Sequence, residues 1–145
     1  MKTFRRETLW TIGFSFFIII GAGHGIACLG LLEIAGLFHA SSIGKEDFSF
    51  SLIASYDKSL SAAALFALIG HILLIVSLAT KTSKSHFWTT ITGLLLLWLS
   101  FFYLTHNLSV DTAAQVSFIT GLPFLIVSII LGYKIIRQKA LAVYG

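Results

Sequence analysis

The chain has 145 residues, of which 57% are hydrophobic and 11% charged, and its mean hydropathy is +0.92. Globular domains carry roughly a quarter charged residues, so this composition excludes an ordinary soluble domain. The net charge of +4 does not indicate nucleic acid as a partner, because the basic residues flank long apolar runs and form no stripe. A single cysteine, Cys28, excludes an internal disulfide. The predicted surrounding is a lipid bilayer.

The first apolar run extends from about residue 9 to residue 38. A spanning helix needs roughly 20 residues, so we expect this longer one to tilt or kink. Glycine weakens a helix interior, and we expect the kink between Gly21 and Gly25, with that face against another helix. Basic residues precede the run as in a signal peptide, but it stays apolar beyond Cys28, which favours a retained helix.

A polar interval follows, from about residue 39 to residue 59. Neither a helical nor a strand period dominates it. It combines charged residues with aromatic ones such as Phe48 and Tyr56, a mixture that suits the headgroup region of a membrane. We therefore expect a short interfacial helix here.

Three further apolar runs cover about residues 60–78, 87–105 and 112–133. Short polar turns separate them, and the last run contains the only proline, Pro123, which a helix bundle can tolerate as a kink. The predicted fold class is an all-α integral membrane four-helix bundle. It forms one domain over residues 1–145, with spans at about 9–38, 60–78, 87–105 and 112–133.

The distribution of basic residues predicts the orientation of these four spans. Lys and Arg in short loops concentrate on the cytoplasmic side. With both termini cytoplasmic, that side holds eight of the ten basic residues: Lys2, Arg5, Arg6, Lys81, Lys84, Lys134, Arg137 and Lys139. Lys45 and Lys58 remain outside. We therefore expect both termini in the cytoplasm, and a bacterial cytoplasmic membrane as the location.

Ionisable residues inside the spans are the candidates for function: His24, Cys28, Glu33 and His71. His24 and Cys28 are four residues apart and share a face of a continuous helix. Glu33 lies near the outer end of its span, where hydration would lower the cost of its charge, so a structural or solvated carboxylate is favoured over a functional one. Both histidines are expected to face the bundle interior, because lipid offers an imidazole no hydrogen bond.

Three interpretations of the two histidines stay open. They can bond to neighbouring helices and hold the bundle together. With Glu33 they can line a polar path for protons or a small solute. They can also serve as axial ligands of a b-type haem, His24 on one side and His71 on the other.

Small residues four positions apart allow close helix packing. Three such pairs occur: Gly21 with Gly25, Ser117 with Gly121, and Ser128 with Gly132. They indicate that the first and last spans pack against another helix, in this chain, in a partner subunit or in a second copy.

Signals for metal binding and catalysis are sparse. His39 and His106 end two spans near acidic residues and could ligate a transition metal, but no compact ligand spacing such as HExxH is present. Walker, dinucleotide-binding, nucleophile-elbow and CxxC patterns are also missing. The only base near Cys28 is His24, so the sequence favours a protein that is not an enzyme.

The predicted function is that of an accessory subunit or homo-oligomer that handles protons or a small solute through a polar interior. The alternative is a redox subunit linked to haem b or quinone, using His24 and His71.

Overall fold

In the computed structural model, the described residues are 4–22, 25–38, 56–80 and 83–144. Most of them lie in five helices, and the remainder include one two-stranded hairpin. The three longest helices are α3 (Tyr56–Ala79), α4 (Ser83–Thr105) and α5 (Thr112–Tyr144). Each of the three is long and apolar enough to cross a membrane.

These three helices cover the predicted runs at 60–78, 87–105 and 112–133. Pro123 lies inside α5, which continues to Tyr144. With 33 residues at ~1.5 Å each, α5 is about 50 Å long and exceeds the ~30 Å hydrocarbon core of a bilayer. Large apolar side chains on the outer faces are exposed, Ile75, Leu95 and Ile126 among them. Exposed apolar surface of this extent is typical of contact with lipid.

The prediction of one kinked helix over the first apolar run is wrong. Helix α1 (Arg5–Phe16) ends early, and two antiparallel strands follow, β1 (Ile19–Ala22) and β2 (Gly25–Cys28). Helix α2 (Leu29–Phe38) then begins directly after β2. The physical reason is local: three consecutive β-branched isoleucines favour a strand, and the glycines after them weaken a helix.

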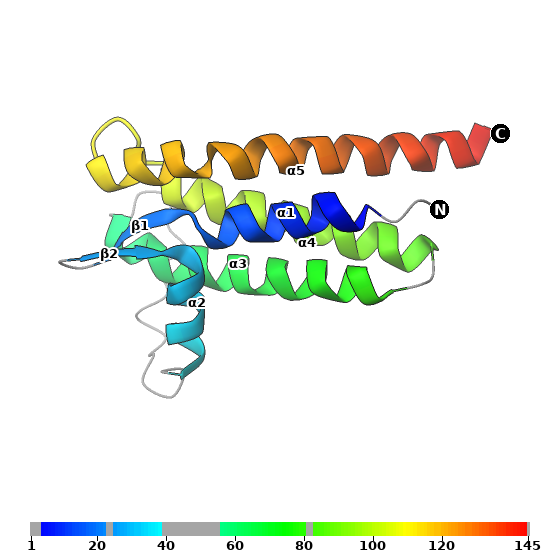
Figure 1. Cartoon of the computed structure of the whole chain (residues 1–145). Coiled ribbons are helices and arrows are strands. Elements are labelled where there is room, and N and C mark those ends of the chain that lie inside the picture. Colours follow the sequence, from blue (N-terminus) through cyan, green and yellow to red (C-terminus); the bar gives the residue numbers. More distant parts are fainter. Residues whose placement is uncertain (1–3, 23–24, 39–55, 81–82, 145) are drawn as a thin grey trace.

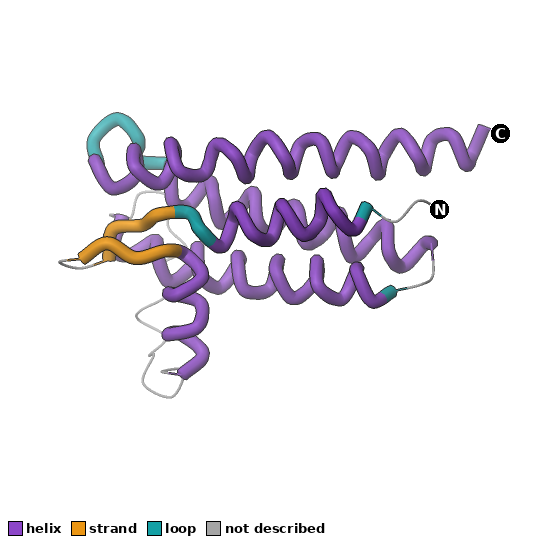
Figure 2. The backbone as a smooth tube through the Cα atoms, in the orientation of Figure 1, coloured by secondary structure: helices purple, strands orange, loops and turns teal. Residues whose placement is uncertain are grey.

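Segments α1 and β1 follow one another along the bundle, and both lie beside α5 (Figure 1). The start of α1, the end of α3, the start of α4 and the end of α5 gather at one end. The hairpin and the loop between α4 and α5 lie at the other end (Figure 2). Helix α2 turns out of this alignment and projects from the side of the bundle next to α3 (Figure 1).

The hairpin is joined to α5 through the backbone of Ile19. Its N–H donates to Oγ1 of Thr120 over 3.1 Å, and its carbonyl accepts from Oγ of Ser117 over 2.9 Å. Lipid cannot satisfy a strand edge, so such an edge needs partners inside the protein. Two hydroxyls of α5 supply them, and this explains how an extended segment can lie within an apolar bundle.

Helices α3 and α4 approach closely at a pair of glycines. A Cβ added to Gly70 would lie 2.9 Å from the Leu97 side chain and 3.0 Å from the Gly93 carbonyl oxygen. A Cβ on Gly93 would lie 3.1 Å from the Gly70 carbonyl oxygen. Only glycine fits at this crossing, which therefore fixes the distance between the two helices.

Candidate functional site: a buried serine, histidine and glutamate

Three polar side chains from three helices meet inside the bundle. Nε2 of His71, on α3, lies 2.6 Å from Oγ of Ser15, on α1. Nδ1 of the same ring lies 2.9 Å from Oε2 of Glu33, on α2. The residues are 1% (Ser15), 5% (His71) and 5% (Glu33) exposed, so the whole chain of hydrogen bonds is shielded from the surroundings.

The hairpin brings Glu33 to this position. It reverses the chain after α1, and the N–H of Leu29 donates to the carbonyl of Ile18 over 2.8 Å, so α2 begins beside the end of α1. Gly30 faces the Phe16 ring so closely that a Cβ would overlap it. One turn further along α2, Glu33 reaches His71.

The Ser15 hydroxyl has two acceptors within reach. Its oxygen lies 2.6 Å from Nε2 of His71 and 3.0 Å from the carbonyl oxygen of Ile12. When the ring is neutral and Nδ1–H donates to Glu33, the hydroxyl donates to Nε2. When the ring is protonated, Nε2–H donates to the serine oxygen and the hydroxyl turns to Ile12. One rotating hydrogen therefore satisfies both protonation states, and no heavy atom has to move.

Glu33 has a second oxygen, Oε1, which is buried and has no hydrogen-bond partner within the described ranges. A buried polar atom without a partner is uncommon in native proteins and calls for an explanation. The Phe16 ring lies beside the site, with its centroid 6.3 Å from that of His71. Oε1 of Glu33 is an acceptor for an additional proton.

Of the four ionisable residues predicted from the sequence as functional candidates, two meet in this site. Glu33 and His71 come together, and the expectation that Glu33 is hydrated is wrong because the carboxylate is buried. Cys28 ends β2 and is half-buried. It therefore does not share a helix face with His24, which lies outside the described residues.

The predicted helix-packing positions also divide into two groups. Gly21 and Gly25 lie on β1 and β2, so the expectation that they pack as a helical pair is wrong. The four on α5 are buried: Ser117, Gly121, Ser128 and Gly132. Ser128 accepts a hydrogen bond from Nε1 of Trp98 over 2.8 Å, which joins α5 to α4.

The predicted metal candidates do not form a ligand set in the described part of the chain. Nδ1 of His106 donates to the carbonyl of Tyr103 over 2.9 Å, and His39 lies outside the described residues. Among the residues that the structure describes, no three His, Cys, Asp or Glu side chains are grouped to hold a metal ion.

Both ring nitrogens of His71 make hydrogen bonds. Nδ1 is bonded to Glu33, as in many ligating histidines, and Nε2 is bonded to Ser15, so iron could bind only in place of that hydroxyl. The predicted partner of His71 in axial ligation, His24, lies outside the described residues. The donor set therefore does not support a bis-histidine haem site.

Ser15 was not among the residues singled out from the sequence. A signal for it exists, because Thr8, Thr11 and Ser15 recur at the spacing of one helix face. All three are buried, and each hydroxyl bonds to a carbonyl of the preceding turn. A polar stripe on an otherwise apolar helix indicates a face turned toward the protein interior.

No protein-family model matches the chain, and neither a curated protein nor a solved structure matches it. The geometry of Ser15, Glu33 and His71 is therefore the basis for assigning a function.

Proposed function

We propose that the chain crosses the cytoplasmic membrane of a bacterium four times, with both termini in the cytoplasm. The fourth crossing segment is α1 followed by β1. The eight helical residues from Leu9 to Phe16 rise about 12 Å and the four extended residues about 13 Å, which together with the two residues between them approach the ~30 Å hydrocarbon core. The charge distribution supports the orientation, since eight of the ten basic residues then lie inside.

Within this arrangement, we propose that Glu33, His71 and Ser15 bind and release a proton. The protein would act as an accessory subunit or homo-oligomer that handles protons or a small solute. The observation that carries the proposal is the position of the Ser15 hydroxyl between two acceptors. A site that serves proton transfer must be stable with and without the proton, and this hydroxyl stabilises both states. Ionisable groups buried in a membrane commonly mark such sites.

A route from this site toward one end of the bundle is suggested by the polar stripe of α1. Thr11 and Thr8 continue from Ser15 toward the start of the helix, at 0% and 1% exposure. Glu7 lies one turn before Thr11, and its carboxylate is paired with Lys134 over 2.6 Å. In the proposed orientation, this stripe leads from the buried histidine to the cytoplasmic surface.

The test is proton flux into liposomes that contain the purified protein and an internal pH-sensitive dye, driven by a potassium diffusion potential. The variant His71→Gln keeps one donor and one acceptor but does not titrate near neutral pH. We expect it to fold and to lose the flux, whereas the matched control His106→Gln keeps it. Equal flux through wild type and His71→Gln would contradict the proposal and leave His71 a structural role.

A second candidate function follows from the order of the hydrogen bonds. The Glu33 carboxylate is bonded to Nδ1 of His71, and Nε2 of the same ring is bonded to the Ser15 hydroxyl. This arrangement is the one that activates a serine nucleophile. Oγ of Ser15 would form a bond to the carbonyl carbon of an ester, and Nε2 would take its proton and pass it to the departing alkoxide. Because Ser15 is 1% exposed, a substrate could reach it only if neighbouring side chains moved aside.

A fluorophosphonate probe separates the two candidates, because it labels activated serines covalently. Nucleophilic catalysis predicts labelling of wild type that is lost in both Ser15→Ala and His71→Gln. An unlabelled wild type with intact proton flux excludes catalysis by Ser15 and favours proton handling.

A further inference from the structure

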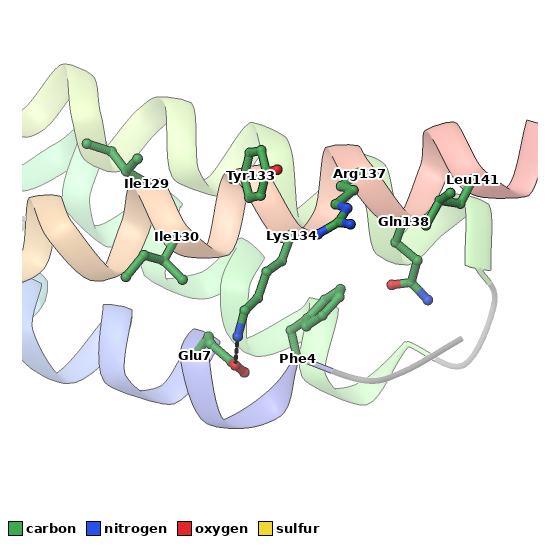
Figure 3. A pocket seen from close by; sticks show the side chains of 9 residues that line it. All are labelled: Phe4, Glu7, Ile129, Ile130, Tyr133, Lys134, Arg137, Gln138 and Leu141. Carbon is green, nitrogen blue, oxygen red and sulfur yellow. Dashed lines mark hydrogen bonds and ion pairs between the residues drawn. The ribbon is translucent and has the colours of Figure 1, made fainter.

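A groove of about 1000 Å³ lies between the first turn of α1 and the last turns of α5 (Figure 3). One part of its wall is apolar, formed by Phe4, Ile129, Ile130 and Leu141. The other part is polar, and its charged members are Glu7, Lys134 and Arg137. The groove is open to the surroundings and separate from the Ser15–His71–Glu33 site.

The charges of this groove leave one cation uncompensated. Nζ of Lys134 lies 2.6 Å from Oε1 of Glu7, so these two groups neutralise each other (Figure 3). Arg137 is exposed and makes no ion pair or hydrogen bond with the described residues. A guanidinium presents several N–H donors in a plane, a geometry that matches phosphate oxygens.

Beside Arg137, the side-chain amide of Gln138 also has an unused group. Its Oε1 is buried and has no hydrogen-bond partner in the described part of the chain. The side chain lines the groove, and the NH₂ group of its amide carries two donors. The groove can therefore offer donors from two consecutive residues to an anion.

The two isoleucines and the arginine lie at different heights along α5. Ile130 lies seven residues before Arg137, a rise of about 10 Å. Phe4 and Leu141, in contrast, lie near the polar residues (Figure 3). In the proposed orientation, the isoleucines lie toward the hydrocarbon core and Arg137 lies at the cytoplasmic headgroups. An anionic phospholipid has this same division between acyl chains and a phosphate.

We propose that the groove between α1 and α5 binds one anionic phospholipid of the inner leaflet. Arg137 and Gln138 bind its phosphate, and Ile129 and Ile130 contact an acyl chain. Basic pockets beside membrane helices on the cytoplasmic side are suited to anionic headgroups.

The test is native mass spectrometry of the full chain in mixed micelles of phosphatidylglycerol and phosphatidylcholine. We expect one bound phosphatidylglycerol per chain, and Arg137→Gln to weaken its binding roughly fivefold, the equivalent of about 1 kcal/mol. Because Arg137 is exposed, this variant should fold, and Arg137→Lys should restore part of the preference. Lys139→Gln is the matched control, since it removes the same charge from α5 but its ammonium lies 4.0 Å from the centroid of the Phe87 ring.

A competition arm distinguishes the lipid from a free anion. Glycerol 3-phosphate without acyl chains should not displace the bound phosphatidylglycerol, because it lacks the apolar contacts. Displacement by glycerol 3-phosphate, equal binding of the two lipids, or equal losses in Arg137→Gln and Lys139→Gln would each overturn the proposal.

Discussion

Oε2 of Glu33 lies 2.9 Å from Nδ1 of His71, although 38 residues separate the two in the chain. The contact joins α2, which projects from the side of the bundle, to α3. Both groups are buried, so each depends on the other to offset the loss of its hydration. The position of α2 and the protonation of the site are therefore linked through one hydrogen bond.

Removal of one partner from this pair should destabilise the protein strongly. His71→Leu leaves the Glu33 carboxylate buried and unpaired, which costs about 3–5 kcal/mol in comparable sites. The double variant Glu33→Leu with His71→Leu should recover much of that loss, because no buried charge remains. Thermal unfolding in detergent, followed by circular dichroism, measures both. A double variant less stable than His71→Leu would contradict the pairing.

Ser15→Ala tests the shared hydroxyl. The substitution leaves Nε2 of His71 without its hydrogen-bond partner, and a buried group in that state costs about 1–3 kcal/mol. Thr11→Val on the same face is the control, because the Thr11 hydroxyl bonds only to the Glu7 carbonyl of its own helix. We expect unfolding midpoints to fall clearly for Ser15→Ala and little for Thr11→Val. Equal changes would show that Ser15 has no special role.

The close approach of α3 and α4 predicts opposite effects for two glycine substitutions. Gly93→Ala places a methyl group against the Gly70 carbonyl and the Leu74 side chain, and overpacking of this kind costs about 1–3 kcal/mol. Gly13→Ala on α1 meets nothing within 4 Å, so it should stabilise the helix by up to about 1 kcal/mol. Unfolding midpoints of the two variants should move in opposite directions. A Gly93→Ala variant that unfolds at the same temperature as wild type would contradict the close approach of α3 and α4.

The ion pair of Glu7 with Lys134 predicts a dependence of stability on pH. The hydrogen bond from Lys134 holds the pKa of Glu7 below its ordinary value of 4.5. A carboxyl group whose pKa is lower in the folded state than in the unfolded state stabilises the protein at pH values above its unfolded-state pKa. This contribution disappears as the pH falls through the folded-state pKa. The Lys134 side chain is 43% exposed, so we expect at most about 1 kcal/mol. The free energy of unfolding of wild type should exceed that of Glu7→Gln at neutral pH, and the difference should disappear on acidification. A difference that does not change with pH would contradict the ion pair.

The sequence was sufficient to predict the three long helices, because their apolar runs exceed the length of a membrane crossing. It was not sufficient for the first run. Hydropathy and length do not distinguish one helix from a helix, a hairpin and a second helix when every segment is apolar. The β-branched residues at 18–20 and the glycines after them carried the missing information.

The site was predictable in part for a similar reason. Glu33 and His71 stood out because ionisable residues are rare in apolar runs. Ser15 did not, since a serine in a membrane helix is common and its partner depends on tertiary packing. The crossing of Gly70 and Gly93 was missed because a search for spacing within one helix does not pair residues on two helices.

We propose that His71, held between Glu33 and Ser15, binds and releases a proton without rearrangement of the site. Nitrogen NMR of histidine-labelled protein in lipid nanodiscs tests it most directly, with His71→Gln used to assign the signals of His71. We expect the two ring nitrogens to change reversibly from the pattern of a neutral ring to that of a protonated ring when the sample is acidified, while the signals of the surrounding backbone stay in place. A ring that keeps one protonation state throughout, or that changes only when the fold is lost, would contradict proton binding at His71.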